Sequence, residues 1–260
     1  MSRSIQSGRT VSSRLLEILF SFRLGRSQLT VADLTRITGM PHATVRRLVI
    51  ELVEAGVLER GDGGLLTVGV RLWQVGMVAP QAYPLRSAAI GFMEDLQATL
   101  GEHVQLAVRV DGEVVVVERL SDVNAVVAVS QVGGRLPLHA SAVGRILLAH
   151  SSRQLVDRVS RESLPAYTSR TVTDPARLRA QLVEHRATGV AVVREELSPL
   201  ADSVATRVMD AKGQVVAALS VIARSGRTDL RSVTPSVVAC GLGISRVLGW
   251  ERHVGVRSAP

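Results

Sequence analysis

The sequence predicts an α+β protein of two domains: a small N-terminal domain of helices and one hairpin, and a larger mixed α/β domain. Three observations support this prediction. The 260 residues leave room for two domains, because a single domain usually holds about 100–200 residues. An apolar fraction of 46% is enough to bury a sizeable core. The pattern also changes near residues 80–84, where short helical segments precede valine-rich runs that alternate with amphipathic helices.

Two short helices are expected first in the chain. From Thr10 to Leu24 the apolar residues recur at helical spacing. A second helix is expected over Val31–Thr38. Thr30 can cap its N-terminus with a side-chain oxygen, and Gly39 can adopt the left-handed conformation that ends a helix.

A third helix and a hairpin complete this domain. Pro41 favours a helix start, since the first N–H groups of a helix are unpaired anyway, and an apolar stripe continues the helix to Gly56. Two apolar stretches then flank the turn GDGG at residues 61–64, which predicts a hairpin. The link TGMP between the second and third helices suits a helix-turn-helix, with the hairpin as its wing.

The remaining chain is expected to form a mostly antiparallel sheet flanked by helices. Two strand-like runs, HVQLAVRV and EVVVVERL, flank Asp111-Gly112 and predict a hairpin. Apolar stripes and capping residues predict the helices Leu85–Leu100, Ser141–His150, Asp174–Thr188 and Pro235–Trp250. Further strands are expected at Val190–Arg194, Val204–Asp210 and Val215–Ala223, the last two joined by a turn at Lys212-Gly213.

Composition excludes several classes of protein. The chain carries 31 basic and 23 acidic residues, a net charge of +8, which permits binding to nucleic acid or an acidic membrane surface but selects neither. The single cysteine, Cys240, excludes an intrachain disulfide and any multi-cysteine metal site. No run approaches about 18 apolar residues, and the first residues lack the apolar stretch of a signal peptide. We therefore expect a cytoplasmic protein with no membrane partner.

The third helix has the side chains that a DNA-recognition helix needs. At 100° per residue, its apolar stripe leaves the opposite side to small, hydrogen-bonding and basic residues. Small or polar side chains near the N-terminus can reach base edges, and arginines can contact guanine or phosphate. The alternative is a solvated face that happens to hold two arginines. The candidate contacts are His42, Ala43, Thr44, Arg46 and Arg47 on the helix, with Arg60 and Arg71 beside the hairpin as phosphate contacts.

Three sequence blocks resemble the IclR family of bacterial transcription regulators. LTVADLTRITGMPHATVRRLVIELVEAGVLER with LTVGVRLWQVG resembles its winged helix, GGRLPLHASAVGRILLAH its second-domain signature, and GVAVVREELSPLADSVATRVMDAKGQVVAALSV its third block. Their order and spacing match from about Ser4 to Trp250. The resemblance implies a winged helix-turn-helix DNA-binding domain at residues 1–79, a connecting helix at 80–100 and a GAF-like effector-binding domain at 101–260.

The resemblance also implies a function. A homodimer or homotetramer, with repressor activity in the family, would bind a palindromic operator in double-stranded DNA and sense a small organic acid of a catabolic pathway. An anionic effector would meet the free N–H groups and the positive end of a helix. The residues implied to line the effector pocket are Ala125, Ala128, Gly133, Gly134, Ser141, Ala142, Val143, Val193, Ala201 and Ser203.

Three positions depart from the family pattern. Val193 stands where members that bind small keto acids can have an acid, and Ser203 where they can have a cysteine. Arg207 replaces a common proline. The pocket is thus less polar at one end, which favours an aromatic or longer organic acid over a small keto acid.

Other candidate chemistry is weaker, and we expect no catalytic residue, metal or cofactor. The six histidines show no ligand spacing for zinc. His139 and Ser141 lack the Gly-x-Ser-x-Gly of a hydrolase and are expected to cap a helix. Glu195 and Glu196, placed on a strand, would point to opposite faces. Cys240 lies in an apolar run and is expected in the core. The alternative function is a GAF-like enzyme that acts on a small organic acid, with an N-terminal segment that serves oligomerisation.

Overall fold

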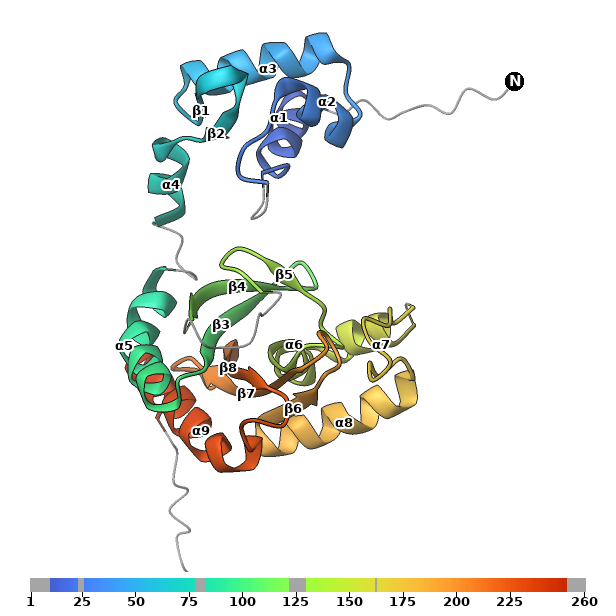
Figure 1. Ribbon diagram of the computed structural model, residues 1–260, viewed down its shortest axis with the longest axis vertical. Coiled ribbons are helices and arrows are strands. Elements are labelled where there is room, and N and C mark those ends of the chain that lie inside the picture. Colours follow the sequence, from blue (N-terminus) through green and yellow to red (C-terminus); the bar gives the residue numbers. More distant parts are fainter. Residues whose placement is uncertain (1–9, 23–25, 78–82, 122–129, 162, 252–260) are drawn as a thin grey trace, which may run out of the picture. The chain divides into compact units, whose positions relative to one another are not determined.

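The chain forms two compact units, and each is described by itself. They comprise residues 1–83 and 84–260 (Figure 1). The computed structural model describes residues 10–22, 26–77, 83–121, 130–161 and 163–251. Among these, no helix has the length and apolar character needed to span a membrane.

The N-terminal unit is a set of short helices followed by a hairpin, as expected. Its elements are α1 (Val11–Leu19), α2 (Val31–Thr38), α3 (His42–Glu54), β1 (Leu58–Arg60), the 3-10 turn η1 (Asp62–Gly64), β2 (Leu66–Val68) and α4 (Val70–Met77). Leu29 forms an isolated bridge with Leu66 and so attaches the loop before α2 to the wing. The apolar faces of α1, α2, α3 and the wing close over one core.

Local hydrogen bonds cap α2 at both ends and begin α3. Thr30 and Gly39 are the caps of α2 that the sequence predicts. Thr30 Oγ1 accepts from the Asp33 N–H, and Asp33 Oδ2 accepts from the Thr30 N–H, both at 3.1 Å. Hydrogen bonds from Thr30 lower the pKa of Asp33 to about 2. Gly39 ends α2 with φ of 65°. The Pro41 carbonyl then accepts from the N–H groups of Thr44 and Val45 in the first turn of α3. The short turn between these two capped ends is that of a helix-turn-helix.

The ends of the N-terminal helices differ from the prediction. Helix α1 ends at Leu19 rather than Leu24, and α3 ends at Glu54, two residues before the expected stop at Gly56. Helix α4 was not expected at all. It begins where Glu59 Oε1 accepts from the Val70 N–H at 3.1 Å, a long-range cap that local spacing does not reveal.

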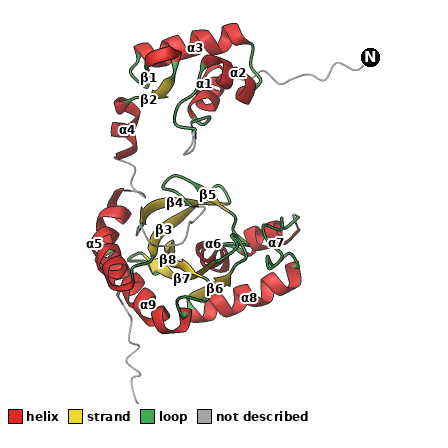
Figure 2. Ribbon diagram, in the orientation of Figure 1, coloured by secondary structure: helices red, strands yellow, loops and turns green. Residues whose placement is uncertain are grey.

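The C-terminal unit is a six-stranded antiparallel sheet with helices on both faces (Figure 2). The strand order is β5-β4-β3-β8-β7-β6. Its strands are β3 (His103–Val110), β4 (Glu113–Leu120), β5 (Arg135–Leu136), β6 (Val190–Arg194), β7 (Ala201–Met209) and β8 (Val215–Arg224). Its helices are α5 (Tyr83–Leu100), α6 (Ala142–Ala149), α7 (Arg153–Arg161), α8 (Pro175–Thr188) and α9 (Leu230–Val247). The predicted mixed domain with a mostly antiparallel sheet is confirmed.

Two apolar cores lie on opposite faces of this sheet. Along β8, Leu219 and Val221 pack with α5 and α9, whereas Ala218 packs with α6 and α8. This alternation follows from the two-residue period of a strand. Helix α5 contributes Leu85 and Met93 to the core that it shares with α9, so it is an integral part of the C-terminal unit.

Several boundaries in this unit differ from the prediction. Helix α9 begins at Leu230 with Asp229 as its N-cap, so Pro235 lies inside the helix rather than at its start. Strand β7 begins at Ala201, three residues earlier than expected. The two-residue strand β5 and the charged helix α7 were not expected, because neither segment has a long apolar pattern.

Candidate functional site

The start of α3 presents a basic and polar surface. His42, Ala43, Arg46 and Arg47 are exposed, and Thr44 is half-buried. The apolar residues between them are buried in the core of the N-terminal unit. A helix that buries one face in a small domain and exposes arginines and small side chains on the other can enter the major groove of DNA.

The two arginines beside the wing have different surroundings. Arg60 is exposed at the end of β1, and its guanidinium lies near Gly64 in the turn of the wing. Arg71 Nη1 instead donates to the Ala55 carbonyl at 3.1 Å, and its side chain packs against Gly56. Arg71 therefore joins α4 to the end of α3, whereas Arg60 has no such intramolecular hydrogen bond among the described residues.

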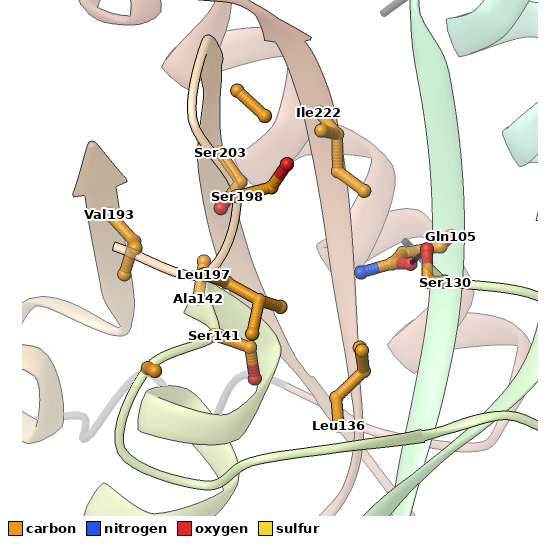
Figure 3. Close-up of a pocket in the computed structure, with 12 residues that line it drawn as sticks. Gln105, Ser130, Leu136, Ser141, Ala142, Val193, Leu197, Ser198, Ser203 and Ile222 are labelled. Carbon is orange, nitrogen blue, oxygen red and sulfur yellow. Dashed lines mark hydrogen bonds between the residues drawn. The ribbon is translucent and has the colours of Figure 1, made fainter. Parts of the chain in front are cut away.

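The C-terminal unit contains a narrow cavity between the sheet and the start of α6 (Figure 3). It has about 460 Å³ of unfilled space, part of which is open to solvent. Its wall is uncharged and mostly apolar. The lining residues are Gln105, Ser130, Leu136, Ala140, Ser141, Ala142, Val193, Leu197, Ser198, Ala201, Ser203 and Ile222.

Five residues expected at an effector pocket meet at this cavity. Ser141 and Ala142 come from the start of α6, Val193 from β6, and Ala201 and Ser203 from β7. Val193 and Ser203 are also partners in the register of β6 and β7. The pairing of β6 with β7 joins residues of one sequence block, and the packing of α6 on the sheet adds residues of another.

Other expected residues lie elsewhere. Val143 is fully buried in the α6 core, and Gly133 and Gly134 are not among the described residues that line the cavity. The Gly133 N–H donates to the Val116 carbonyl at 2.7 Å, and the Gly134 carbonyl accepts from the Val116 N–H at 3.0 Å. This turn is therefore bound to β4. Ala125 and Ala128 lie outside the described residues.

Sequence reasoning missed several residues of the cavity wall. Leu136 lies in the two-residue strand β5, Leu197 lies in the turn after β6, and Ile222 is near the end of the mostly apolar strand β8. Gln105 and Ser130 are polar but nearly inaccessible, at 3% and 4% exposure. The one available signal was Gln105 itself, a polar residue within the otherwise apolar run HVQLAV.

The start of α6 can bind an anion. Ser141 is the N-cap, and its Oγ accepts from the Gly144 N–H at 3.1 Å and donates to the Pro137 carbonyl at 2.7 Å. The N–H groups of Ala142 and Val143, in the first turn, have no carbonyl partner within the helix. Because the N-terminus of a helix also carries a partial positive charge, a carboxylate in the cavity would be stabilised here.

A buried ion pair connects α6 to the loop beside the cavity. The Arg145 guanidinium pairs with the Glu196 carboxylate, and its Nε donates to the His139 carbonyl at 2.7 Å. Glu196 also accepts from the Val172 N–H at 2.9 Å. Burial lowers the pKa of Arg145, and Glu196 opposes that effect. The pair holds Leu197, the next residue, against the cavity.

The prediction that Glu195 and Glu196 lie on a strand was wrong. Strand β6 ends at Arg194, and Glu195 turns the chain with φ of 53°. The Glu195 carboxylate pairs with Arg170 at 3.0 Å, whereas Glu196 pairs with Arg145. The carboxylates have different partners because the chain turns, not because a strand alternates.

Two other expectations concern His139 and Cys240. Ser141 caps α6 as expected, but His139 does not: its Nε2 lies 3.0 Å from the Pro165 carbonyl. Cys240 is buried, donates to the Phe92 carbonyl, and has a pKa raised to about 12, mainly by burial. It is a core residue, as predicted. The described residues contain no group of three or more side chains that could hold a metal ion.

A second, more open space adjoins the cavity. This groove has about 1120 Å³ of unfilled space, much of it continuous with solvent. Leu136 and Leu197 line both spaces and separate them. The charged groups Arg135 and Glu113 in the groove pair with each other. The smaller cavity is the better candidate, because its mostly apolar wall carries a few polar groups and adjoins the start of α6.

Comparison with known proteins identifies two matching family profiles. One, described as the IclR helix-turn-helix domain, matches residues 12–62. The other, described as the bacterial transcriptional regulator IclR C-terminal domain, matches residues 78–246.

Individual relatives agree with these profiles. The Pca regulon regulatory protein of Pseudomonas putida is 31% identical over 92% of this chain and 82% of its own length. The HTH-type transcriptional regulator KipR of Bacillus subtilis is 29% identical over 89% and 94%. The crystal structure of an IclR homolog from Microbacterium hydrocarbonoxydans, complexed with 4-hydroxybenzoate, has a TM-score of 0.88 and 33% identity over 92% and 99%. The chain therefore belongs to the IclR family of bacterial transcriptional regulators.

Proposed function

We propose that this protein is a DNA-binding transcriptional regulator that changes its operator affinity when a small organic acid binds its C-terminal unit. The observation that carries the proposal is the exposed basic face of α3, in a helix-turn-helix that matches the family profile. The candidate DNA contacts on α3 lie close together in the sequence, and none of them belongs to the apolar core of the N-terminal unit.

The DNA contacts divide into two kinds. Arg46 and Arg47 contact guanine or phosphate, and the shorter side chains of His42, Ala43 and Thr44 allow the start of α3 to approach the bases. Arg60, on the wing, contacts a phosphate. Arg71 is a weaker candidate for a phosphate contact, since its guanidinium already bonds to the end of α3. We take residues 1–79 as the DNA-binding domain, 80–100 as the connecting helix and 101–260 as the effector domain.

The effector is a monocarboxylic acid with an apolar body. Its carboxylate binds at the N-terminus of α6, and its body packs against Leu136, Val193 and Leu197. The wall offers no charged side chain among the described residues, so the helix N-terminus is the best place for a single negative charge. The 4-hydroxybenzoate complex of the Microbacterium relative is an acid of this chemical kind.

The protein acts as a homodimer or homotetramer on a palindromic operator in the cytoplasm. A two-fold symmetric dimer presents two recognition helices to two half-sites, which explains why such regulators read palindromes. Repression is the mode suggested by relatives named transcriptional repressors.

The alternative, an enzyme acting on a small organic acid, has less support. Two carboxylates adjoin the cavity wall in sequence, Glu196 and Asp202, and both are paired, Glu196 with Arg145 and Asp202 with Arg194. A general base needs a free carboxylate within reach of the substrate. Turnover of an organic acid in the absence of DNA would favour the enzyme.

Footprinting of the protein on the DNA upstream of its own gene tests this function. The titration is repeated with aliphatic and aromatic monocarboxylic acids, at low and high salt. We expect a protected palindrome, a steep loss of affinity with salt because phosphate contacts release counterions, and a change of affinity with at least one acid.

The variant Ala142→Phe tests the cavity. The added ring fills the space at the start of α6, so operator binding should survive while the response to the acid is lost. An unchanged response at the same concentrations would show that the effector binds elsewhere. Absence of any protected site would contradict the regulator itself.

A further inference from the structure

The cavity has a second polar end, on the sheet side. Gln105 projects from β3, and Figure 3 shows its amide nitrogen pointing into the cavity from the side opposite the helix start marked by Ser141 and Ala142. Leu136 and Ile222 line the wall between these two ends. An occupant therefore meets a helix N-terminus at one end and an amide donor at the other.

The Gln105 side chain is held in this orientation. Its Oε1 accepts from Ser130 Oγ at 2.7 Å, and both residues are nearly inaccessible to solvent. The Arg119 guanidinium, from the β4 residue paired with Gln105, donates to the Ser130 carbonyl. Because its oxygen is occupied by Ser130, the amide presents its nitrogen to the cavity.

The amide nitrogen of Gln105 lacks an acceptor among the described residues. Gln105 lines the cavity and is almost fully buried. A buried polar group without a partner costs free energy, so a ligand oxygen that accepts from this nitrogen would be favoured.

We propose that the Gln105–Ser130 pair selects effectors that carry a hydroxyl or carbonyl oxygen at the end opposite their carboxylate. This inference rests on the proposed effector site. A second carboxylate would not serve at this end, because no charged side chain among the described residues lines the cavity and an unpaired buried charge is costly. The effector class is thus hydroxy- or oxo-substituted monocarboxylic acids with an apolar body.

Matched pairs of acids test this inference on the full-length protein. The probes are 3- and 4-hydroxybenzoate against benzoate, and 6-hydroxyhexanoate against hexanoate, with binding measured by calorimetry without DNA. For at least one pair, the parent should bind the hydroxy acid about 5- to 100-fold more tightly, the range expected when one buried donor is satisfied or left unpaired.

The variant Gln105→Leu removes the donor at nearly constant size. We expect its preference for that hydroxy acid to fall to near unity, mainly through weaker binding of the hydroxy acid. Ser130→Ala releases the amide oxygen and should reduce the preference in part, which keeps the test open if Gln105→Leu does not fold. Ser232→Ala removes an exposed hydroxyl on α9 outside the cavity wall and should leave the preference unchanged. Operator binding and thermal unfolding verify that each variant is folded.

The outcomes separate the two proposals. If acids bind and Ala142→Phe blocks them, but the preference is absent from the parent or survives in both Gln105→Leu and Ser130→Ala, this inference is overturned and the proposed function stands. If Ala142→Phe leaves acid binding unchanged, or no acid of either pair binds, the effector site and this inference both fail.

Discussion

The recognition surface and the effector cavity are built in different ways. The candidate DNA contacts of α3 are Thr44 and its neighbours in the sequence. They lie on one helix, and most of their side chains are exposed. The cavity wall joins residues as distant in sequence as Gln105 and Ile222, which come from strands of the sheet, from the start of α6 and from loops. Substitutions on α3 should therefore change binding without changing stability, whereas those around the cavity should change both.

The largest difference is expected for two ion pairs of contrasting burial. Glu196→Gln leaves the fully buried Arg145 without its charged partner and should destabilise the C-terminal unit by about 3–5 kcal/mol. Arg36→Ala removes the pair with Asp33 at 2.8 Å on the solvent-exposed side of α2, where a much smaller loss is expected because water screens the charges. Urea unfolding followed by circular dichroism measures both.

A double replacement provides the control for this prediction. Arg145→Met with Glu196→Leu removes both charges and should recover much of the stability lost in Glu196→Gln, because no unpaired charge is left in the core. Equal losses for the buried and the exposed pair would contradict the contrast between the two regions.

The second prediction concerns operator affinity. Arg46→Ala and Arg47→Ala should each weaken binding by about 5- to 100-fold, as expected for the loss of a bidentate arginine–guanine contact worth about 1–3 kcal/mol. The unfolding of the C-terminal unit should not change, since neither side chain belongs to a core. A gel-shift titration with the footprinted operator measures the effect, and unchanged affinity in both variants would reject this surface.

The third prediction concerns pH and the end of α6. Burial, with Arg207 and Arg186 nearby, lowers the pKa of His150 to about 4. The unfolded chain takes up this proton near pH 6.5, so stability present above that value is lost as the pH falls toward 4. Between pH 6.5 and 5 this loss should reach about 1–2 kcal/mol.

His150→Asn tests that assignment, because asparagine takes up no proton in this range. The variant should be less sensitive to pH than the parent by the stated amount in urea unfolding at several pH values. An identical pH dependence in parent and variant would mean that His150 is protonated as readily in the folded protein as in the unfolded chain.

The smallest effects should distinguish the two arginines of the wing. Arg60→Ala should flatten the plot of log affinity against log salt by about one unit, if it removes one phosphate contact. Arg71→Ala should change the slope less but destabilise the N-terminal unit by about 1 kcal/mol, because its hydrogen bond to Ala55 is lost. If Arg71→Ala flattened the salt plot and Arg60→Ala lowered the stability of the N-terminal unit, the two roles would be exchanged.

Local features of the fold were largely predictable. Thr30 and Gly39 bound α2, Asp174 and Pro175 start α8, and β6 has the expected limits. Each depends on residues within a few positions of one another, through caps, turns or a short apolar pattern. Ser141 was likewise correctly expected to cap α6.

Non-local features were not predictable in the same way. Helix α4 depends on a cap from Glu59, and Arg71 is held by the end of α3. The turn at Glu195 follows from hydrogen bonds and ion pairs with segments that are distant in sequence. Periodicity carries no information about such contacts, because it reports only which face of an element is apolar.

The sequence by itself determined the order of the main elements, though not α4, β5 and α7, together with the polar face of α3 and the family, because these depend on local spacing and on blocks of matching residues. Only the tertiary structure decided which side chains share a wall. The register of β3, β7 and β8 places Gln105, Ser203 and Ile222 around one cavity, while Gly133 and Val143 lie away from it. Strand pairing is a long-range interaction, and a shift of one residue would turn each of these side chains to the other face of the sheet.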